Sequence, residues 1–378
     1  MGFGRELSSR ERIMRIFCNQ EVDRPALKLW GAQPGTALLH PAYEPVQRLA
    51  LQTSDIFAAA SSPFSMYWGK NEANFVSIER RPTDSPLWQD EITLAQLSGR
   101  VLRQVCRVST KGEPPYVTEH FVKEPADLES LLRLPYEPYP FHIESFSRTE
   151  AAVGNRGVTL FSLDHPGYAL QRLTGSETLA YFSVDCRPLL LQAVEIFSRR
   201  VRQQAEQALK AGVRLFQWVG PEVFLPPLLS PKDFEDFCFG PDAALCNDIH
   251  NSGGYVWVHS HGKVADFIPR FIQMGVDVLN PLEPPKNGDV ALSQLVERYG
   301  AAIGWEGNVE IQELLLSDKE RLTPLITQCV QAGAASGRFI LCPSAGFMEY
   351  PAPTERYIDN LLFYLRFGLQ AVQSYARG

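Results

Sequence analysis

Two histidines separated by one residue, His259 and His261, are the residues of this sequence best placed to do chemistry. They close an apolar run, residues 255–259, that predicts a β-strand. Alternate residues at a strand end point the same way, about 6–7 Å apart, so both imidazoles could reach one ion. Imidazole is a good ligand for zinc. The alternative is a pair of histidines that hydrogen-bond to neighbours in a polar setting without a metal.

Three further side chains, Glu222, Glu306 and Cys342, each lie at or just past the end of an apolar run. A catalytic zinc takes three protein ligands, and any of the three could be the third one; our metal set is His259, His261 and Cys342. An unpaired carboxylate is costly to bury, so Glu222 and Glu306 are candidate catalytic acid–base groups. The alternatives are a carboxylate paired with Lys or Arg and, for Cys342, a small core residue.

Four other residues at run ends, Trp30, Asp164, His165 and Asn280, are candidates for binding a substrate. Asp164 and His165 open the segment Asp-His-Pro-Gly, which is also the sequence of a simple turn. Trp30 could belong to an aromatic wall or to the hydrophobic core.

The elements that must position these residues recur along the chain. Apolar runs rich in β-formers alternate with helical patterns, and four of the runs follow a Gly that can end the preceding helix. Nearly continuous apolar strands are typical of a parallel sheet buried on both faces. The eight runs are residues 25–30, 55–60, 158–164, 213–219, 255–259, 276–280, 301–306 and 338–342.

Eight such units predict an α/β fold, a (β/α)8 barrel, whose active site lies at the carboxyl ends of the strands. The alternative is an open doubly wound sheet, but no Gly-x-Gly-x-x-Gly motif follows any run. We expect one domain over residues 1–378. Residues 61–156 form a long insertion between the second and third strands, with β-like stretches at 75–80, 101–109 and 118–122 and helices at 125–134 and 141–153. We expect it to cover the barrel mouth as a lid.

Composition excludes several classes of protein. The net charge of −7 and the lack of a basic stripe exclude a nucleic-acid binder. No apolar run reaches the ~18 residues of a membrane span, and the polar start gives no secretory signal, so we expect a cytoplasmic protein. Seven cysteines without a CxxC pair give neither a disulfide framework nor a four-cysteine zinc site.

Several segments resemble the uroporphyrinogen decarboxylase superfamily, which implies the same barrel. These segments are 19–25 (NQEVDRP), 259–262 (HSHG), 275–283 (GVDVLNPLE), 306–308 (EGN) and 339–343 (FILCP).

The decarboxylase itself matches poorly. Its arginine-rich loop after the first strand corresponds here to residues 30–35, which contain no arginine, and its catalytic aspartate corresponds to about Ser61-Ser62. The corrinoid-linked methyltransferase branch binds zinc through His-x-Cys and a later Cys. The resemblance therefore implies zinc at His259, with His261 in place of a Cys. Cys342 corresponds only loosely, because the family cysteine aligns nearer Ala345.

We therefore predict an enzyme that moves a methyl group between a small methylated compound and a corrinoid. No Asp-x-His-x-x-Gly signature occurs, so the corrinoid must come on a partner protein. Barrels of this type also often form homodimers. The rival predictions are a metal-independent lyase or decarboxylase that acts on a small carboxylic acid, and a barrel that only binds a small molecule or partner.

Overall fold

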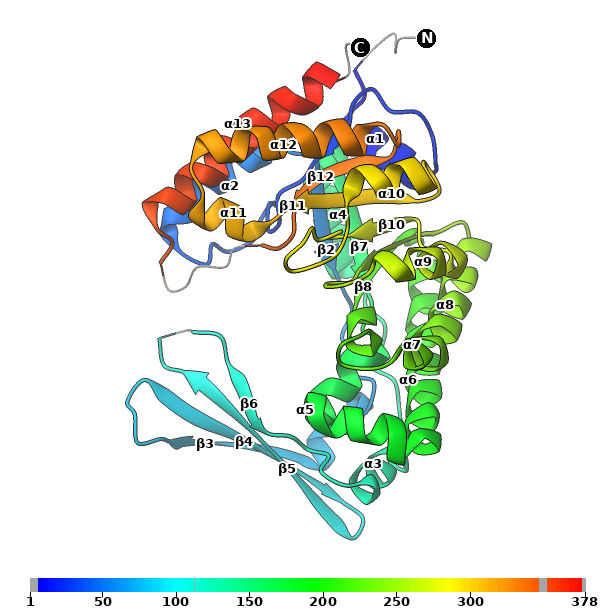
Figure 1. The fold of residues 1–378 in the computed structure, drawn as a ribbon. Coiled ribbons are helices and arrows are strands. Elements are labelled where there is room, and N and C mark those ends of the chain that lie inside the picture. The colour runs from blue at the N-terminus through cyan, green and yellow to red at the C-terminus, as the bar shows by residue number, and fades with distance from the viewer. Residues whose placement is uncertain (1–5, 112, 347–351, 376–378) are drawn as a thin grey trace.

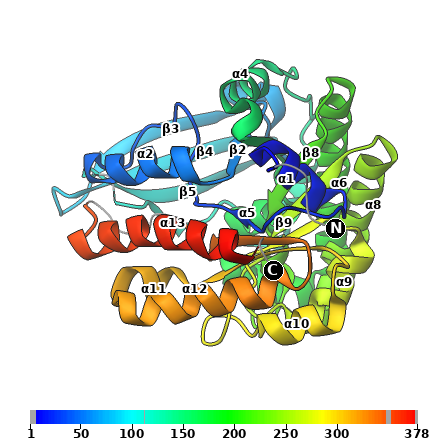
Figure 2. The same cartoon turned by 90° about the horizontal axis from the view of Figure 1, so that it is seen from above.

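The computed structural model describes residues 6–111, 113–346 and 352–375. Eight parallel strands form one curled sheet in the order β1-β12-β11-β10-β9-β8-β7-β2. Helices lie around the outside of this sheet (Figures 1 and 2). The predicted (β/α)8 class is therefore confirmed. The strands are β1 (Ala26–Leu27), β2 (Ile56–Ala60), β7 (Gly157–Ser162), β8 (Leu215–Val219), β9 (Tyr255–His259), β10 (Val278–Asn280), β11 (Gly304–Val309) and β12 (Phe339–Pro343).

All eight predicted strands occur, and one boundary changes the reading of the site. The apolar pattern ended the seventh strand at Glu306, but β11 runs on to Val309. Gly307 and Asn308 continue the parallel ladder, with Asn308 opposite Cys342 of β12. Glu306 therefore lies inside the barrel wall rather than at the strand end, and its side chain is fully buried.

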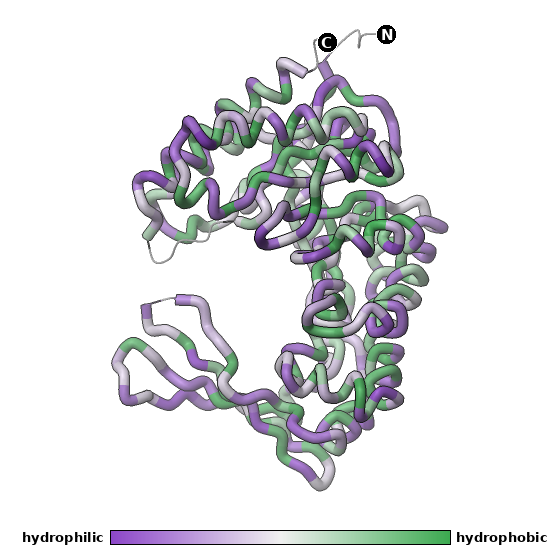
Figure 3. The backbone as a smooth tube through the Cα atoms, in the orientation of Figure 1, coloured by the Kyte–Doolittle hydropathy of each residue, from purple (hydrophilic) through white to green (hydrophobic). Residues whose placement is uncertain are grey.

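Amphipathic helices cover the sheet, so hydrophobic and hydrophilic residues alternate along them (Figure 3). No helix among the described residues is long and apolar enough to cross a membrane. The helices of four or more residues outside the insertion are α1 (Ser9–Phe17), α2 (Glu44–Thr53), α5 (Pro166–Asp185), α6 (Arg187–Lys210), α7 (Pro231–Phe234), the π-helical turn η5 (Glu235–Phe239), α8 (Gly240–Asn251), α9 (Ile268–Met274), α10 (Leu292–Tyr299), α11 (Ile311–Leu316), α12 (Lys319–Ala334), α13 (Glu355–Tyr375) and the 3-10 turn η4 (Pro221–Phe224).

Asp55 joins the two end strands of the sheet. Its backbone N–H donates to the Leu27 carbonyl at 2.7 Å, and its carboxylate accepts from the Leu27 N–H at 2.8 Å. The same carboxylate accepts from Arg12 of α1 and from Arg24, at 2.7 and 3.0 Å. Charge-assisted bonds of this kind are stronger than neutral ones. The barrel seam and the first helix are thus held by one buried aspartate.

Arg338 closes the end of the barrel where the strands begin. It is 4% exposed, and its guanidinium donates to the carbonyl oxygens of Ile16, Phe17, Ala301 and Asp277. Burial lowers its pKa, and the nearby Asp277 opposes that effect. One buried cation therefore ties α1 to the starts of β10, β11 and β12.

The insertion forms an antiparallel meander beside the barrel. Strands β3 (Val76–Pro82), β4 (Trp88–Leu97), β5 (Arg100–Ser109) and β6 (Tyr116–Glu119) pair in sequence order. The sequence pattern did not predict β4. Helices α3 (Pro125–Leu132) and α4 (Glu144–Val153) follow and lead into β7. The meander stands away from the parallel strands (Figure 1), and its role as a lid stays a prediction.

His250, at the end of α8, forms a hydrogen bond with Asp277, which precedes β10, and the strength of this contact depends on pH. Its Nε2 lies 2.8 Å from an Asp277 oxygen, and this hydrogen bond raises the pKa of His250 against the opposing effect of burial. A raised folded-state pKa stabilises the protein fully below the unfolded value near 6.5, and this stabilisation is lost as pH rises through the folded value.

We therefore expect His250→Gln to reduce the stability difference between pH 5.5 and pH 8.5. The imidazole is 34% exposed, so solvent screening limits the change to about 0.5 kcal/mol. Urea unfolding at the two pH values measures it. The exposed His142, substituted in the same way, is the control. An equal pH dependence in the wild type and His250→Gln would contradict the assignment.

Candidate active site

A buried ion pair between Lys28 and Glu306 lies in the barrel interior. Lys28 Nζ is 2.6 Å from Glu306 Oε1, and the two side chains are 5% and 0% exposed. The ammonium also lies 4.2–4.7 Å from the ring centroids of Trp30, Phe57 and Trp257. Buried charges require such partners. Glu306, predicted as a catalytic acid–base group, is therefore paired with a lysine, as the alternative interpretation held.

Glu306 accepts two more hydrogen bonds, which fix its neighbours. Trp257 Nε1 donates to Oε2 at 2.8 Å, and Asn280 Nδ2 donates to Oε1 at 2.8 Å. The Asn280 amide is thereby oriented with its oxygen toward His259. Asn280, predicted to bind substrate, is fully buried. In this structure it links Glu306 to His259.

The contacts from Glu306 through Asn280 fix the tautomer of His259. Its Nδ1 lies 2.6 Å from Asn280 Oδ1, and because that oxygen can only accept, Nδ1 carries the proton. Nε2 keeps its lone pair. Burial, followed by the positive neighbours His261 and Lys28, lowers the pKa of His259 to about 3. The ring packs against the indoles of Trp257 and Trp30. His259 is thus a neutral imidazole with one nitrogen available.

His261 is held by a different group. Its Nδ1 donates to Glu283 Oε1 at 2.9 Å, and Glu283 Oε2 accepts from the Gly262 N–H at 2.7 Å. Burial lowers the pKa of His261, but Glu283, Glu222 and Glu310 together outweigh it and raise the pKa. The two imidazole centroids are 4.3 Å apart, with the rings nearly perpendicular.

The loop that carries Glu283 is constrained by β11. Leu282 has a φ of +56°, which non-glycine residues rarely adopt. Asn308 Nδ2 donates to the Leu282 carbonyl at 2.7 Å and holds this conformation. Residues in such conformations persist where their surroundings fix them, and they occur often at functional sites.

Glu222 lies in η4, just after β8. Tyr168 Oη donates to Glu222 Oε1 at 2.7 Å, and the Gly220 N–H donates to Oε2 at 3.0 Å. Burial and this carboxylate raise the pKa of Tyr168. Glu222 is half-buried and contributes to the raised pKa of His261, so its charge acts on that histidine.

Cys342 lies deep in β12 and is fully buried. Burial, and next the neighbouring Glu306, raise the pKa of Cys342 well above its usual value. Among the residues that the structure describes, the only three metal-ligand side chains whose donor atoms lie within 4.8 Å of one another are His165, Cys238 and Asp242. The structure therefore does not bring the Cys342 sulfur together with both imidazoles, and their joint metal site stays a prediction.

His165, predicted to bind substrate, caps α5 instead of facing open space. The Gly167 N–H donates to its Nδ1 at 3.1 Å, so Nε2 carries the proton and points at Asp242, 3.2 Å away. Trp218 Nε1 donates to the same Asp242 oxygen at 3.1 Å. A protonated Nε2 has no lone pair for a metal. The His165, Cys238 and Asp242 cluster is thus a satisfied hydrogen-bond network.

The remaining predicted residues lie at the carboxyl ends of their strands. Trp30 Nε1 donates to the Pro343 carbonyl at 2.9 Å, while Asp164 is 44% exposed and lies 3.6 Å from Arg172. Sequence reasoning missed Lys28, Trp257 and Glu283. A signal for Lys28 existed, because a lysine inside an apolar strand must find a partner.

The fold and site define an α/β barrel with polar groups gathered at and below the ends of its strands. The sequence matches the profile of the uroporphyrinogen decarboxylase (URO-D) family over residues 106–355, more than half of the chain. The chain therefore belongs to the uroporphyrinogen decarboxylase family, whose resemblance the sequence had already suggested.

A solved structure shows the same fold. A methyltransferase from Methanosarcina mazei superimposes with a TM-score of 0.58 at 16% identity, over 96% of this chain and 99% of that one. Two others are less alike: a putative vitamin-B12-independent methionine synthase from Listeria monocytogenes (TM-score 0.37, 15% identity, 61% and 70% covered) and a D-psicose 3-epimerase from Clostridium cellulolyticum H10 (0.38, 10%, 62% and 85%). No protein of curated function matches the sequence.

The Lys28–Glu306 pair gives a stability prediction. Lys28→Met leaves the Glu306 carboxylate buried without its cation, so we expect a loss of about 3 kcal/mol or more in the free energy of unfolding. Adding Glu306→Gln removes the uncompensated charge and should recover part of the loss. Urea unfolding followed by circular dichroism measures both.

The matched control is Lys210→Met, which removes a cation from the exposed pair with Glu206. That variant should cost less than about 0.5 kcal/mol. Strictly additive losses in the Lys28→Met and Glu306→Gln single and double variants would show that the two charges are not coupled.

Proposed function

We propose that this protein is a corrinoid-linked methyltransferase, in which zinc bound at His259 and His261 assists methyl transfer between a small methylated substrate and a corrinoid on a partner protein. The observation that carries the proposal is the pair of oriented imidazoles at the end of β9. Family membership and the methyltransferase fold support it.

The histidine pair fits a zinc ion by its donor chemistry. Each Nδ1 is engaged, His259 with Asn280 and His261 with Glu283, so each neutral imidazole offers Nε2. Metal-binding histidines commonly donate their other N–H to a carboxylate or carbonyl in this way. When bound, zinc would act as a Lewis acid that activates a thiolate or polarises an oxygen.

The third ligand is proposed to come from Glu222 or Cys342. Glu306 is the weaker of the three candidates, because Lys28, Trp257 and Asn280 already occupy both of its oxygens. Glu222 accepts from one tyrosine and one backbone N–H, and its charge reaches His261.

Residues around the pair would set the environment of the reaction. The indoles of Trp30 and Trp257 cover His259 and exclude water from its buried side. Glu283 keeps the His261 ring in place, and Tyr168 is a hydroxyl donor beside Glu222. An aromatic wall next to polar groups is typical of small-molecule sites.

A second candidate function is metal-free decarboxylation or lyase chemistry on a small carboxylic acid. His261 favours it, because Glu283 raises its pKa against the opposing effect of burial and so favours the protonated ring. Such an imidazolium could protonate the carbanion left by loss of CO2. The family name fits this chemistry too.

Metal content separates the two candidates. We expect about one zinc per chain in protein purified without chelator, because catalytic zinc sites bind tightly. His259→Ala/His261→Ala should bind none, and Glu283→Gln should weaken zinc binding roughly 10–100-fold by releasing the His261 ring. Elemental analysis and a competition titration measure these changes. His142→Ala, a substitution at an exposed histidine, should keep the zinc.

Methyl transfer to a free or protein-bound corrinoid, followed by its absorption spectrum, tests the reaction itself. Zinc removal by chelation should abolish transfer, and added zinc should restore it. Full transfer by metal-free protein would refute the zinc role. CO2 release from a carboxylic acid without any corrinoid, unaffected by chelation, would favour the decarboxylase instead.

A further inference from the structure

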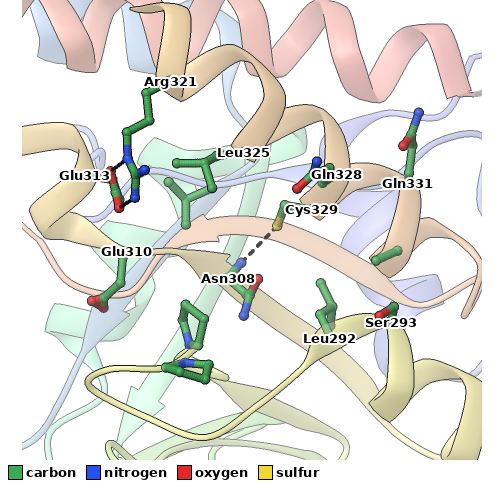
Figure 4. Close-up of a pocket in the computed structure, with 14 residues that line it drawn as sticks. Leu292, Ser293, Asn308, Glu310, Glu313, Arg321, Leu325, Gln328, Cys329 and Gln331 are labelled. Atoms are coloured by element: carbon green, nitrogen blue, oxygen red, sulfur yellow. Dashed lines mark hydrogen bonds and ion pairs between the residues drawn. The ribbon is translucent and has the colours of Figure 1, made fainter. Parts of the chain in front are cut away.

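A pocket of about 680 Å³ lies outside the barrel wall, between α10, α12 and the segment that follows Glu283. In Figure 4 Asn308 of β11 lies at its centre, with Gln328 and Cys329 of α12 on one side and Ser293 of α10 on another. Pockets of a few hundred cubic ångströms are the size that small molecules occupy. None of the histidines predicted to bind zinc lines it.

The pocket has an apolar lining, with exposed polar side chains at its edge that the protein itself does not engage. Leu292, Val309 and Leu325 are among its apolar residues. The side chains of Ser293, Gln328 and Gln331 make no hydrogen bond within the described part of the chain. Asn308 donates through Nδ2 to Leu282, while its Oδ1 accepts no hydrogen bond from the described residues. Amide side chains offer both a donor and an acceptor.

Charge in the pocket disfavours an anion. Its one cation, Arg321, is neutralised by Glu313, which accepts from both Nε and Nη2. A second carboxylate, Glu310, also lines the pocket and accepts from Ser344 and Asn287. The three charged side chains of the lining sum to −1. Lys286, directly after Pro285, acts on the Glu313 carboxylate, so the lining itself offers a carboxylate or phosphate net repulsion and no unpaired cation.

We propose that this pocket binds an uncharged, flat small molecule that carries an amide or a similar donor–acceptor edge, such as a heterocycle. The flat body would lie on Leu292, Val309 and Leu325, and its edge would pair with the amides of Asn308 and Gln328. Neutral amide-to-amide pairing satisfies donor and acceptor together without charge.

The position of the pocket links it to the histidine pair. Its lining includes Pro284, the residue directly after Glu283, and Asn308, whose side chain holds the Leu282 carbonyl. A bound molecule would therefore touch both supports of the loop that positions Glu283 against His261. The binding proposal itself does not depend on the reaction at the barrel mouth.

Two matched pairs of probes test the ligand class: benzamide against benzoate, and nicotinamide against nicotinate. Ligand-observed NMR titration on the full chain should give a dissociation constant of about 1–10 mM for the amides, as expected for ligands of this size. The carboxylates should bind at least about tenfold more weakly. Equal binding of both members of a pair, or no binding of either amide at ~10 mM, would overturn the proposal.

Variants locate the site. Leu325→Trp fills the pocket and Gln328→Leu removes an amide at an exposed helical position, so each should weaken amide binding several-fold. Glu320→Trp, also on α12 but outside the pocket, is the control for folding and for a new aromatic side chain. His259→Ala should leave binding unchanged. Amide binding that survives both pocket variants, or that is lost in His259→Ala, places the site elsewhere and refutes the proposal.

Discussion

The Lys28–Glu306 ion pair is the interaction on which the site depends. A charged pair inside a barrel is stable only when every remaining hydrogen-bonding atom has a partner, and here Trp257 and Asn280 supply those partners. Because Trp257 and Asn280 must donate to Glu306, the orientations of their side chains are fixed. Asn280 then has one amide orientation, and His259 has one tautomer. Lys28, the residue directly after β1, thus helps to determine which nitrogen of His259, on β9, keeps its lone pair.

The two histidines differ because different elements hold them. His259 is buried beside a lysine and bonded to a neutral amide, and its pKa is lowered to about 3. His261 is more exposed and bonded to a carboxylate, and its pKa is raised. The His259 ring therefore stays neutral and keeps a lone pair, while the His261 ring gains a proton more readily. Metal binding requires a lone pair on both rings. Acid–base chemistry depends instead on the difference between the two pKa values.

The sequence predicted the architecture because buried parallel strands have a strong signature. Continuous apolar runs, four of them preceded by glycine, located all eight strands, and residues at or just past the run ends included both histidines and Asn280. Strand boundaries were less accurate, since Gly307 and Asn308 are weak β-formers and ended the predicted run three residues before Val309. The error placed Glu306 at the barrel mouth instead of in its wall.

The roles of individual site residues were harder to predict, because they depend on contacts between distant segments. Lys28 and Glu306 are 278 residues apart, and no local pattern pairs them. Glu283 was visible as part of a strand-end segment, but its role follows from the positive φ of Leu282 and the amide of Asn308. The β4 strand was missed because its residues alternate irregularly between polar and apolar types on a partly exposed sheet.

The closure of the barrel has a consequence for how the chain folds during its synthesis. β1 pairs with β12, so Ala26 lies opposite Ile340, and Arg338 holds the carbonyls of Ile16 and Phe17 at the end of α1. The first strand and helix therefore lack their final partners until nearly the whole chain has left the ribosome. Contacts so far apart in sequence form slowly, and unpaired strands promote aggregation meanwhile. Nascent chains that stop before β12 are thus the forms of this protein with the greatest need of a chaperone.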